Sequence, residues 1–227
     1  MSEQVHILSE FDDALSALKN NTLEMGVLTK RNVENAFTGL SQRDLAICNQ
    51  VIADDEEVDQ LEIQIDNDSL QVMAKFQPFA SDLRLVVASM KITHNLERIS
   101  DHAVSIAKRS RKIIKFGELE EIALIEPSYT HALNMLDSAI NSYTDKSTEI
   151  ALSVLEMEED LNKYHKAATK AFIKRLQKPS DDYKTFLNLT FITRWIERIG
   201  NLSTNIAEDV IFMESAQDIR HGGELEE

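Results

Sequence analysis

The sequence predicts an all-α protein built from two tandem three-helix units with internal pseudo-two-fold symmetry. Six Gly and 3 Pro among 227 residues are too few turn formers for many short strands. Apolar residues recur at helical spacing over long stretches. The segment Glu97–Ala107 returns as Glu197–Ala207, with Glu-Arg-Ile and Ile-Ala at the same offset of 100 residues (197 − 97). A repeat of this length indicates two copies of one supersecondary unit.

The first unit is predicted to span residues 1–117 and to contain three long helices. The first helix is expected over residues 6–39, with Gly39 at its end. Ser41 is placed as the N-cap of the second helix, residues 42–75, which carries an apolar seam beside an acidic stripe.

Pro78 is expected to end the second helix, because proline cannot continue the hydrogen-bonded ladder. Ser81 is placed as the cap of the third helix, residues 82–116, which Gly117 ends. An apolar seam runs along it through Leu85, Ile92, Leu96, Ile99, Ala103 and Ile106. Its end is basic, through Lys108, Arg109, Arg111, Lys112 and Lys115, and this cluster is interpreted as a solvated helix end that favours the dipole.

The second unit, residues 118–219, repeats the plan. Its helices are expected over residues 127–143 and 148–177 and from a break near Pro179 to about Ala216. Phe191 and Trp195 of the last helix are assigned to the core. The polar tail, residues 220–227, is expected to be flexible.

Composition restricts the function. The formal net charge of −15 argues against nucleic-acid binding and against direct adhesion to anionic lipid, and it suits cations or a basic partner surface. The single cysteine, Cys48, cannot form an internal disulfide. The first eight residues lack a secretory signal, and no stretch approaches the roughly 20 apolar residues of a membrane span. We therefore expect a cytoplasmic protein.

Carboxylates of the first unit are placed to bind a metal. Asp55, Asp59 and Glu62 lie one turn apart along the second helix, and Glu97 and Asp101 lie one turn apart on the third. The short link makes these helices antiparallel neighbours, so the two acidic stripes should meet. Converging carboxylates repel one another unless a cation lies between them, and divalent ions with oxygen ligands suit such a site.

The second unit offers a weaker version of this site. Glu158 and Asn162 correspond to Asp55 and Asp59 at an offset of 103 residues, and Glu197 and Asn201 correspond to Glu97 and Asp101 at an offset of 100. Two acids have become amides, which can ligate but bring no charge, so any second site should bind cations more weakly.

Other interpretations stay open. Acidic residues beside an apolar seam are commonly the flanking positions of packed helices and bind nothing. Arg98 and Arg198 are expected to pair with nearby acids, with anion binding as the alternative. His102 follows Asp101 directly and points about 100° away around the helix, so it is not assigned as a ligand.

No catalytic apparatus is evident in the sequence. There is no glycine-rich phosphate loop and no nucleophile with its base. No Glu-x-x-His pair lies on the seam, as in di-iron bundles, which disfavours redox chemistry.

The chain resembles the PhoU family of phosphate-signalling regulators. The resemblance rests on residues 55–62 (DEEVDQLE), residues 77–84 (QPFASDLR) and the two Glu-Arg-Ile segments. It implies a cytoplasmic, non-enzymatic regulator, active as a homodimer, that links the ATPase of the phosphate ABC transporter to the phosphate-sensing histidine kinase. Such a regulator meets the membrane only through its partners and represses the phosphate-starvation response when phosphate is plentiful.

The resemblance also implies one metal cluster per unit on E/D-x-x-x-D motifs. In the first unit the motifs fall on Asp55, Asp59, Glu97 and Asp101. In the second they fall on Glu158, Asn162, Glu197 and Asn201, where the two asparagines depart from the pattern. The metal, divalent or trivalent, could be iron, zinc, manganese, magnesium or calcium.

Two further classes of function remain alternatives to the metal-binding regulator. One is a metal-dependent enzyme of a helical-bundle type, such as a phosphohydrolase, which would need an open metal position and a base. The other is a helical scaffold without metal. Metal content and phosphoester turnover would separate the three.

Overall fold

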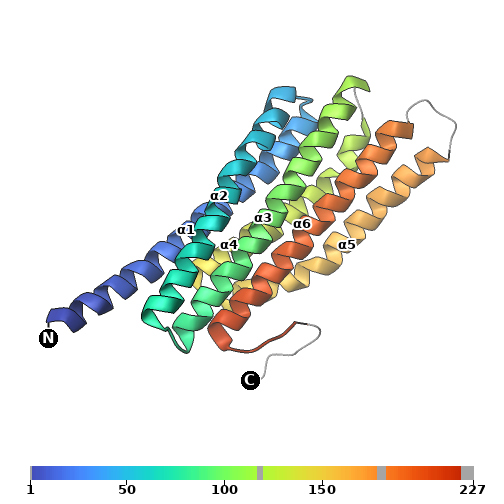
Figure 1. Cartoon of the computed structure of the whole chain (residues 1–227). Helices are drawn as coiled ribbons and strands as arrows, with labels where there is room; N and C mark the ends of the chain where they lie inside the picture. The colour runs from blue at the N-terminus through green and yellow to red at the C-terminus, as the bar shows by residue number, and fades with distance from the viewer. Residues whose placement is uncertain (1, 117–119, 178–182, 221–227) are drawn as a thin grey trace.

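Two groups of three helices form the chain in the computed structural model (Figure 1), which describes residues 2–116, 120–177 and 183–220, with side chains from residue 9 onward. The first group is α1 (Ser2–Ser41), α2 (Leu45–Phe76) and α3 (Ser81–Ile113), and the second is α4 (Glu126–Asp145), α5 (Thr148–Leu176) and α6 (Tyr183–Ser215). Two 3₁₀ turns, η1 (Ile114–Phe116) and η2 (Glu120–Leu124), lie between the groups. These described ranges contain no strand, and the all-α prediction of two tandem three-helix units is confirmed.

The helices lie in two layers (Figure 1). Central α3 and α6 pack against each other, with α2 beside α3 and α5 beside α6. Behind them, α1 packs on α2 and α3, while α4 packs on α5 and α6. The seams of the central helices repeat at the offset of 100: Ile92, Ile99 and Ile106 of α3 and Ile192, Ile199 and Ile206 of α6 are all at most 2% exposed. One continuous core therefore joins the two units.

The turns that follow α1 and α4 have the same structure. The backbone N–H of Asp44 donates to the carbonyl of Gly39, and that of Ser147 donates to the carbonyl of Ser142, both at 3.0 Å. The residue before each cap is left-handed, with φ of 58° and 53°. The backbone structure of the first turn is therefore repeated 103 residues later (147 − 44). The same offset relates α1 and α2 to α4 and α5.

Two sequence assignments at the first turn are wrong. Helix α1 continues past Gly39 to Ser41, and the N-cap of α2 is Asp44, whose side chain accepts from the backbone N–H groups of Ala46 and Ile47. Gly39 serves close packing instead, because a Cβ there would lie 2.7 Å from the Sγ of buried Cys48. Glycine at this position lets α1 approach α2, and it does not end the helix.

The second turn ends α2 as expected from Pro78, with left-handed Gln77 as its C-cap. The predicted cap of α3 is wrong: Ser81 is already the first helical residue, and Ala80, with φ of 52°, precedes it without a side-chain cap. The predicted stop at Gly117, the break near Pro179 and the tail beyond residue 220 lie outside the described residues.

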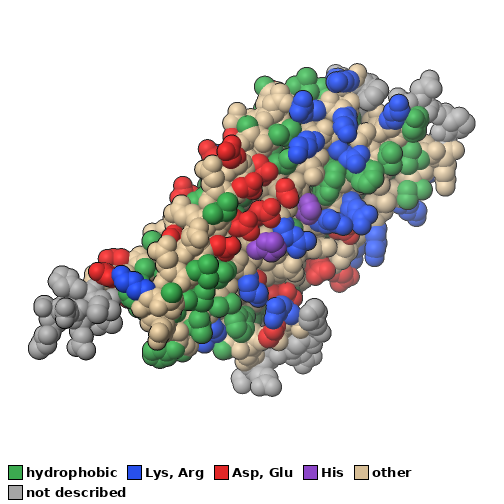
Figure 2. All heavy atoms as spheres, in the orientation of Figure 1, with side chains coloured by type: hydrophobic (Ala, Val, Ile, Leu, Met, Phe, Trp, Pro, Cys, Tyr) green, Lys and Arg blue, Asp and Glu red, His purple; other side chains and the backbone are tan. Residues whose placement is uncertain are grey.

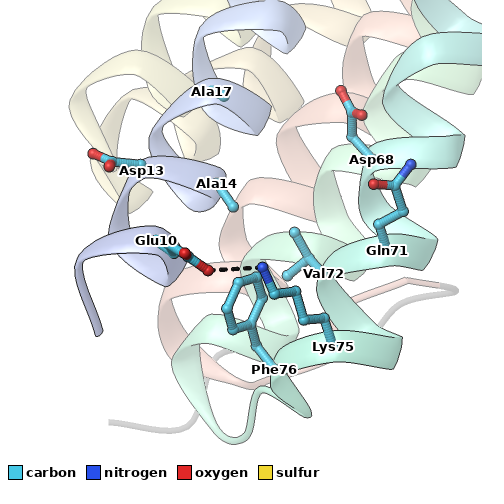
Figure 3. A pocket seen from close by; sticks show the side chains of 9 residues that line it. All are labelled: Glu10, Asp13, Ala14, Ala17, Asp68, Gln71, Val72, Lys75 and Phe76. Atoms are coloured by element: carbon cyan, nitrogen blue, oxygen red, sulfur yellow. Dashed lines mark hydrogen bonds and ion pairs between the residues drawn. The ribbon is translucent and has the colours of Figure 1, made fainter. Parts of the chain in front are cut away.

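The first part of α1 diverges from the end of α2 and leaves a hollow of about 370 Å³ (Figure 3). An ion pair of 2.7 Å between Glu10 and Lys75 crosses its edge. Phe76 lines the hollow, and its ring centroid lies 5.2 Å from that of Phe11. In the described parts of the chain, every helix is too polar or too short to traverse a bilayer.

Candidate metal centre in the first unit

The acidic stripes of α2 and α3 meet on one face of the molecule. Figure 2 shows acidic side chains gathered over these two helices in the middle of the face. The charges of Asp59 and Asp101 act on Asp55, and those of Asp101, Glu62 and Asp59 act on Glu97. All five predicted carboxylates of the first unit therefore belong to one electrostatic cluster, which the packing of α2 on α3 assembles.

Glu97 has the most perturbed carboxyl group of this cluster. Burial raises its pKa to about 7, and the charges of Asp101, Glu62 and Asp59 add to that increase, while His94 opposes it. Near neutral pH this carboxyl group is therefore protonated in a substantial fraction of the molecules. A bound cation would restore the charged form, because it would replace the repulsion between carboxylates with attraction.

A buried polar chain orients Asp55 from inside the bundle. The Nδ2 of Asn32 donates to Ser100 Oγ at 3.1 Å, and Ser100 Oγ donates to Asp55 Oδ1 at 2.8 Å. Asn32 and Ser100 are both fully buried. Burial raises the pKa of Asp55 although the Ser100 hydrogen bond opposes that change. This chain was not predicted from the sequence, where its signal is two polar residues inside apolar seams.

The tightest group of possible ligands differs from the predicted one. Among the described residues, one set of three brings its ligand atoms within 4.8 Å of one another, and it consists of Glu62, His94 and Glu97. His94 Nδ1 lies 3.3 Å from Glu62 Oε1. The sequence analysis missed His94, although the order His94-x-x-Glu97 places both side chains on one helix face.

The predicted quartet of Asp55, Asp59, Glu97 and Asp101 is a looser arrangement. No three of its members bring their ligand atoms within this distance of one another in the described part of the chain, and their convergence around an ion stays a prediction. Their assignment as metal ligands stays a prediction.

The second unit builds its equivalent face differently. Gly200 stands where the first unit has Ser100, and a Cβ on it would lie 2.2 Å from Leu161 Cδ2 and 3.2 Å from Met135 Sδ. Met135 is the counterpart of Asn32 at the offset of 103, so apolar packing replaces the buried polar chain. Asn201 is exposed there. The metal-ligand roles predicted for the second unit, at Glu158 and Glu197, stay predictions.

A histidine occupies the position of Glu62 in the second unit. At the offset of 103 that position is His165, whose Nε2 lies 3.4 Å from Glu197 Oε2. His165 Nδ1 lies 3.3 Å from the Thr193 carbonyl. The second unit therefore pairs its half-buried glutamate with a ring nitrogen, where the first unit has a second carboxylate.

Arginines predicted to pair with acids do not do so. Within the described ranges, neither Arg98 nor Arg198 forms an ion pair. Burial, and then the charges of Arg198 and Arg98, lower the pKa of His102 to about 4. This histidine is therefore neutral near pH 7 and lies outside the group of three ligands.

The basic end of α3 is only in part a solvated helix end. Arg109 lies 3.9 Å from the ring centroid of Phe191 and 5.2 Å from that of Trp195, and it donates to Asn188 Oδ1 at 2.8 Å. Burial lowers its pKa. Phe191 and Trp195 are half-buried. Their predicted place in the core is therefore wrong, and the two rings stack with Arg109 at the edge of the core. The other cations line a hollow with α2: Lys108, Arg111, Lys112 and Lys115.

The donors present fit a bound cation. Carboxylates from two helices share one cluster, in which Asp59 and Asp101 are exposed and the other three are half-buried. The pKa values of Asp55 and Glu97 are raised, and Asp55 is oriented by a buried hydroxyl. Oxygen ligands of this kind suit hard divalent ions, and one imidazole extends the range to borderline metals.

Comparison with known proteins identifies relatives over nearly the whole chain. A family model described as "PhoU domain" matches residues 22–110 and 129–210, one segment inside each predicted unit, whose outer limits stay a prediction. A phosphate-specific transport system accessory protein PhoU homolog of Pseudomonas putida is 30% identical over 96% of this chain and 86% of its own. The homolog of Rhizobium meliloti is 32% identical over 92% of this chain and 88% of its own.

Solved structures agree as well. The crystal structure of PhoU from Pseudomonas aeruginosa superposes with a TM-score of 0.88 at 28% identity, over 91% of this chain and 100% of that one. The phosphate transport system regulatory protein PhoU from Streptococcus pneumoniae gives 0.84 at 25% identity, over 92% and 98%. The two three-helix units, their repeated Glu-Arg-Ile segments and these matches together show that the chain belongs to the PhoU family.

Proposed function

We propose that this chain regulates phosphate uptake and phosphate-starvation signalling. The observation that carries the proposal is its match, over nearly its full length, to proteins named as phosphate-specific transport system accessory proteins and to one named as a phosphate transport system regulatory protein. A match of this extent includes both helical units and the loop of residues 77–80 between α2 and α3.

In this proposal the chain acts in the cytoplasm as a non-enzymatic homodimer. It contacts the ATPase of the phosphate ABC transporter and the phosphate-sensing histidine kinase, and it represses the starvation response while phosphate is plentiful. The names of the relatives support association with the transport system. The acidic net charge and the long exposed helix faces suit docking to basic partner surfaces.

The proposal includes a carboxylate metal site in the first unit. Asp55, Asp59, Glu62, Glu97 and Asp101 would hold the metal between α2 and α3. The bound ion supplies positive charge and fixes the two helices against each other. The hydrogen bond from Ser100 would hold the Asp55 carboxylate in position for the ion. The identity of the metal, among iron, zinc, manganese, magnesium and calcium, follows from elemental analysis of protein purified without chelator.

Deletion of the gene in its own host tests the regulatory role. Transcription of phosphate-starvation genes should rise in phosphate-rich medium, and the wild-type gene supplied in trans should restore repression. Unchanged transcription would contradict the proposal. Turnover of a generic phosphoester with added divalent metal separates the regulator from the enzyme alternative, because only an enzyme would give metal-dependent turnover that disappears in site variants.

The metal site has a separate test. Replacing Glu97 and Asp101 together by Ala should remove most of the metal that co-purifies with the wild-type chain. The matched control is the double replacement of Glu197 and Asn201 by Ala, which alters the equivalent face of the second unit and should remove less. Equal metal content in the wild type and the first variant would show that the ligands lie elsewhere.

A further inference from the structure

The group of Glu62, His94 and Glu97 differs from a purely carboxylate site. Glu62 comes from α2 and the other two from α3, so the group bridges two helices. Their ligand atoms lie within 4.8 Å of one another, a separation that a single ion could span by small side-chain rotations. His94 contributes a ring nitrogen, and its side chain is 64% exposed, so a hydrated ion can reach it.

We propose that Glu62, His94 and Glu97 form a mixed nitrogen–oxygen site that selects borderline divalent metals such as zinc over magnesium and calcium. The inference rests on the metal site of the proposed function, which it deepens by assigning a nitrogen ligand and a selectivity. Imidazole is a good ligand for zinc, iron and nickel, whereas magnesium and calcium take oxygen ligands almost exclusively. His94 is therefore the residue that shifts the preference of an otherwise hard site.

An ordinary ion pair explains this group less well than a metal site does. His94 can neutralise one carboxylate if it is protonated, but Glu62 and Glu97 both face it, and Asp59 and Asp101 add two further negative charges. One imidazolium therefore leaves the group strongly negative. A divalent ion, bound to neutral imidazole and to two carboxylates, brings twice the charge to the same place.

The second unit supplies the contrast. The residues at the corresponding positions are His165, Arg194 and Glu197, at offsets of 103, 100 and 100, and all three line one hollow of about 410 Å³. Arginine carries a permanent positive charge and has no lone pair to offer a metal. The second unit therefore places a guanidinium group near the position where the first unit would place an ion. His94 against Arg194 adds to the loss of charge at Asn162 and Asn201 in favouring the first unit as the metal site.

Titration calorimetry on the full chain, first freed of metal with a chelator, tests this selectivity. Zn²⁺ and Ca²⁺ are added separately to the wild type, to His94→Gln and to the control His131→Gln, whose ring Nε2 lies 2.8 Å from the Met157 carbonyl away from the site. His94→Gln should weaken Zn²⁺ binding by about tenfold or more, because even residues that only support a metal ligand cost that much. It should leave Ca²⁺ binding within about twofold, and the control should match the wild type for both ions.

A gain-of-binding variant completes the test. Arg194→His should add a second Zn²⁺ equivalent, since it completes in the second unit a set of ring nitrogens around Glu197. The inference is overturned if His94→Gln binds Zn²⁺ as the wild type does, or if it weakens Zn²⁺ and Ca²⁺ equally. Either result leaves the carboxylate site of the proposed function in place. If the wild type binds no divalent ion, both the selectivity and the carboxylate metal site are refuted. The regulatory role would still be tested separately by the gene deletion.

Discussion

Replacing Glu97 by Gln should stabilise the metal-free protein above neutral pH. In the folded chain the pKa of Glu97 is raised from 4.5 to about 7, chiefly by burial. The folded state therefore holds this proton more tightly than the unfolded state, so the associated stability is present below about pH 4.5 and is lost as pH rises through 7. Glutamine resembles the protonated carboxyl group in shape and cannot ionise. The Glu97→Gln variant should therefore not lose this stability as the pH rises.

The size of the gain follows from the shift. A difference of about 2.5 pKa units corresponds to roughly 3 kcal/mol at 1.36 kcal/mol per unit. Glu97 is only half-buried, so solvent screening reduces this figure, and we expect about 1–2 kcal/mol at pH 8. At pH 4 both folded and unfolded chains carry a largely protonated Glu97, and the variant should differ from the wild type by no more than a few tenths of a kcal/mol.

Urea unfolding followed by far-ultraviolet circular dichroism, with chelator present, measures both values. Glu197→Gln is the matched control, because the positions equivalent to Asp59, Asp101 and Glu62 are Asn162, Asn201 and His165. With no acids at these positions, its gain at pH 8 should be smaller than that of Glu97→Gln. Adding divalent metal at pH 8 should reverse the order and favour the wild type. The reasoning is refuted if Glu97→Gln is destabilised at pH 8, or if its effect is the same at both pH values.

Three further predictions concern packing and metal. Ser100→Ala should lower the free energy of unfolding in urea by about 1–3 kcal/mol, because it removes the hydroxyl that bonds the half-buried Asp55 carboxylate and the buried Asn32 amide. An unchanged unfolding midpoint would show that neither hydrogen bond contributes to stability. Gly200→Ala should cost about 1–3 kcal/mol, since its Cβ would meet Leu161 at 2.2 Å, and a neutral effect would mean that the core yields freely there. Chelation should speed amide hydrogen exchange in α2 and α3 more than in α5 and α6, and equal change in all four helices would argue against a first-unit site.

The sequence by itself determined the helices, the repeat and the acidic faces. Each of these depends on spacing along a single helix: apolar residues every three or four positions mark the buried seam, and acids four apart share a face. The correspondence of Ile99 with Ile199, and of Glu97 with Glu197, follows from the offset of 100 residues alone. Recognising it required no knowledge of how the helices pack. The breaks at the ends of α1 and α2 could be placed for the same reason, since Pro78 and the polar segment 41–44 act locally.

Only the tertiary structure decided which side chains from different helices meet. His94 joins Glu62 and Glu97, Ser100 reaches Asp55, and Arg109 lies on Phe191 because of the rotation and sliding of one helix against its neighbour. Helical periodicity specifies which face of each helix is apolar, but it leaves the longitudinal register between two helices open. That register is set by packing, as at Gly39 against Cys48 and Gly200 against Leu161, where the missing Cβ allows a close approach. The proposed metal-binding group is therefore a property of the helix packing, because its residues lie on two helices whose contact the sequence alone does not specify.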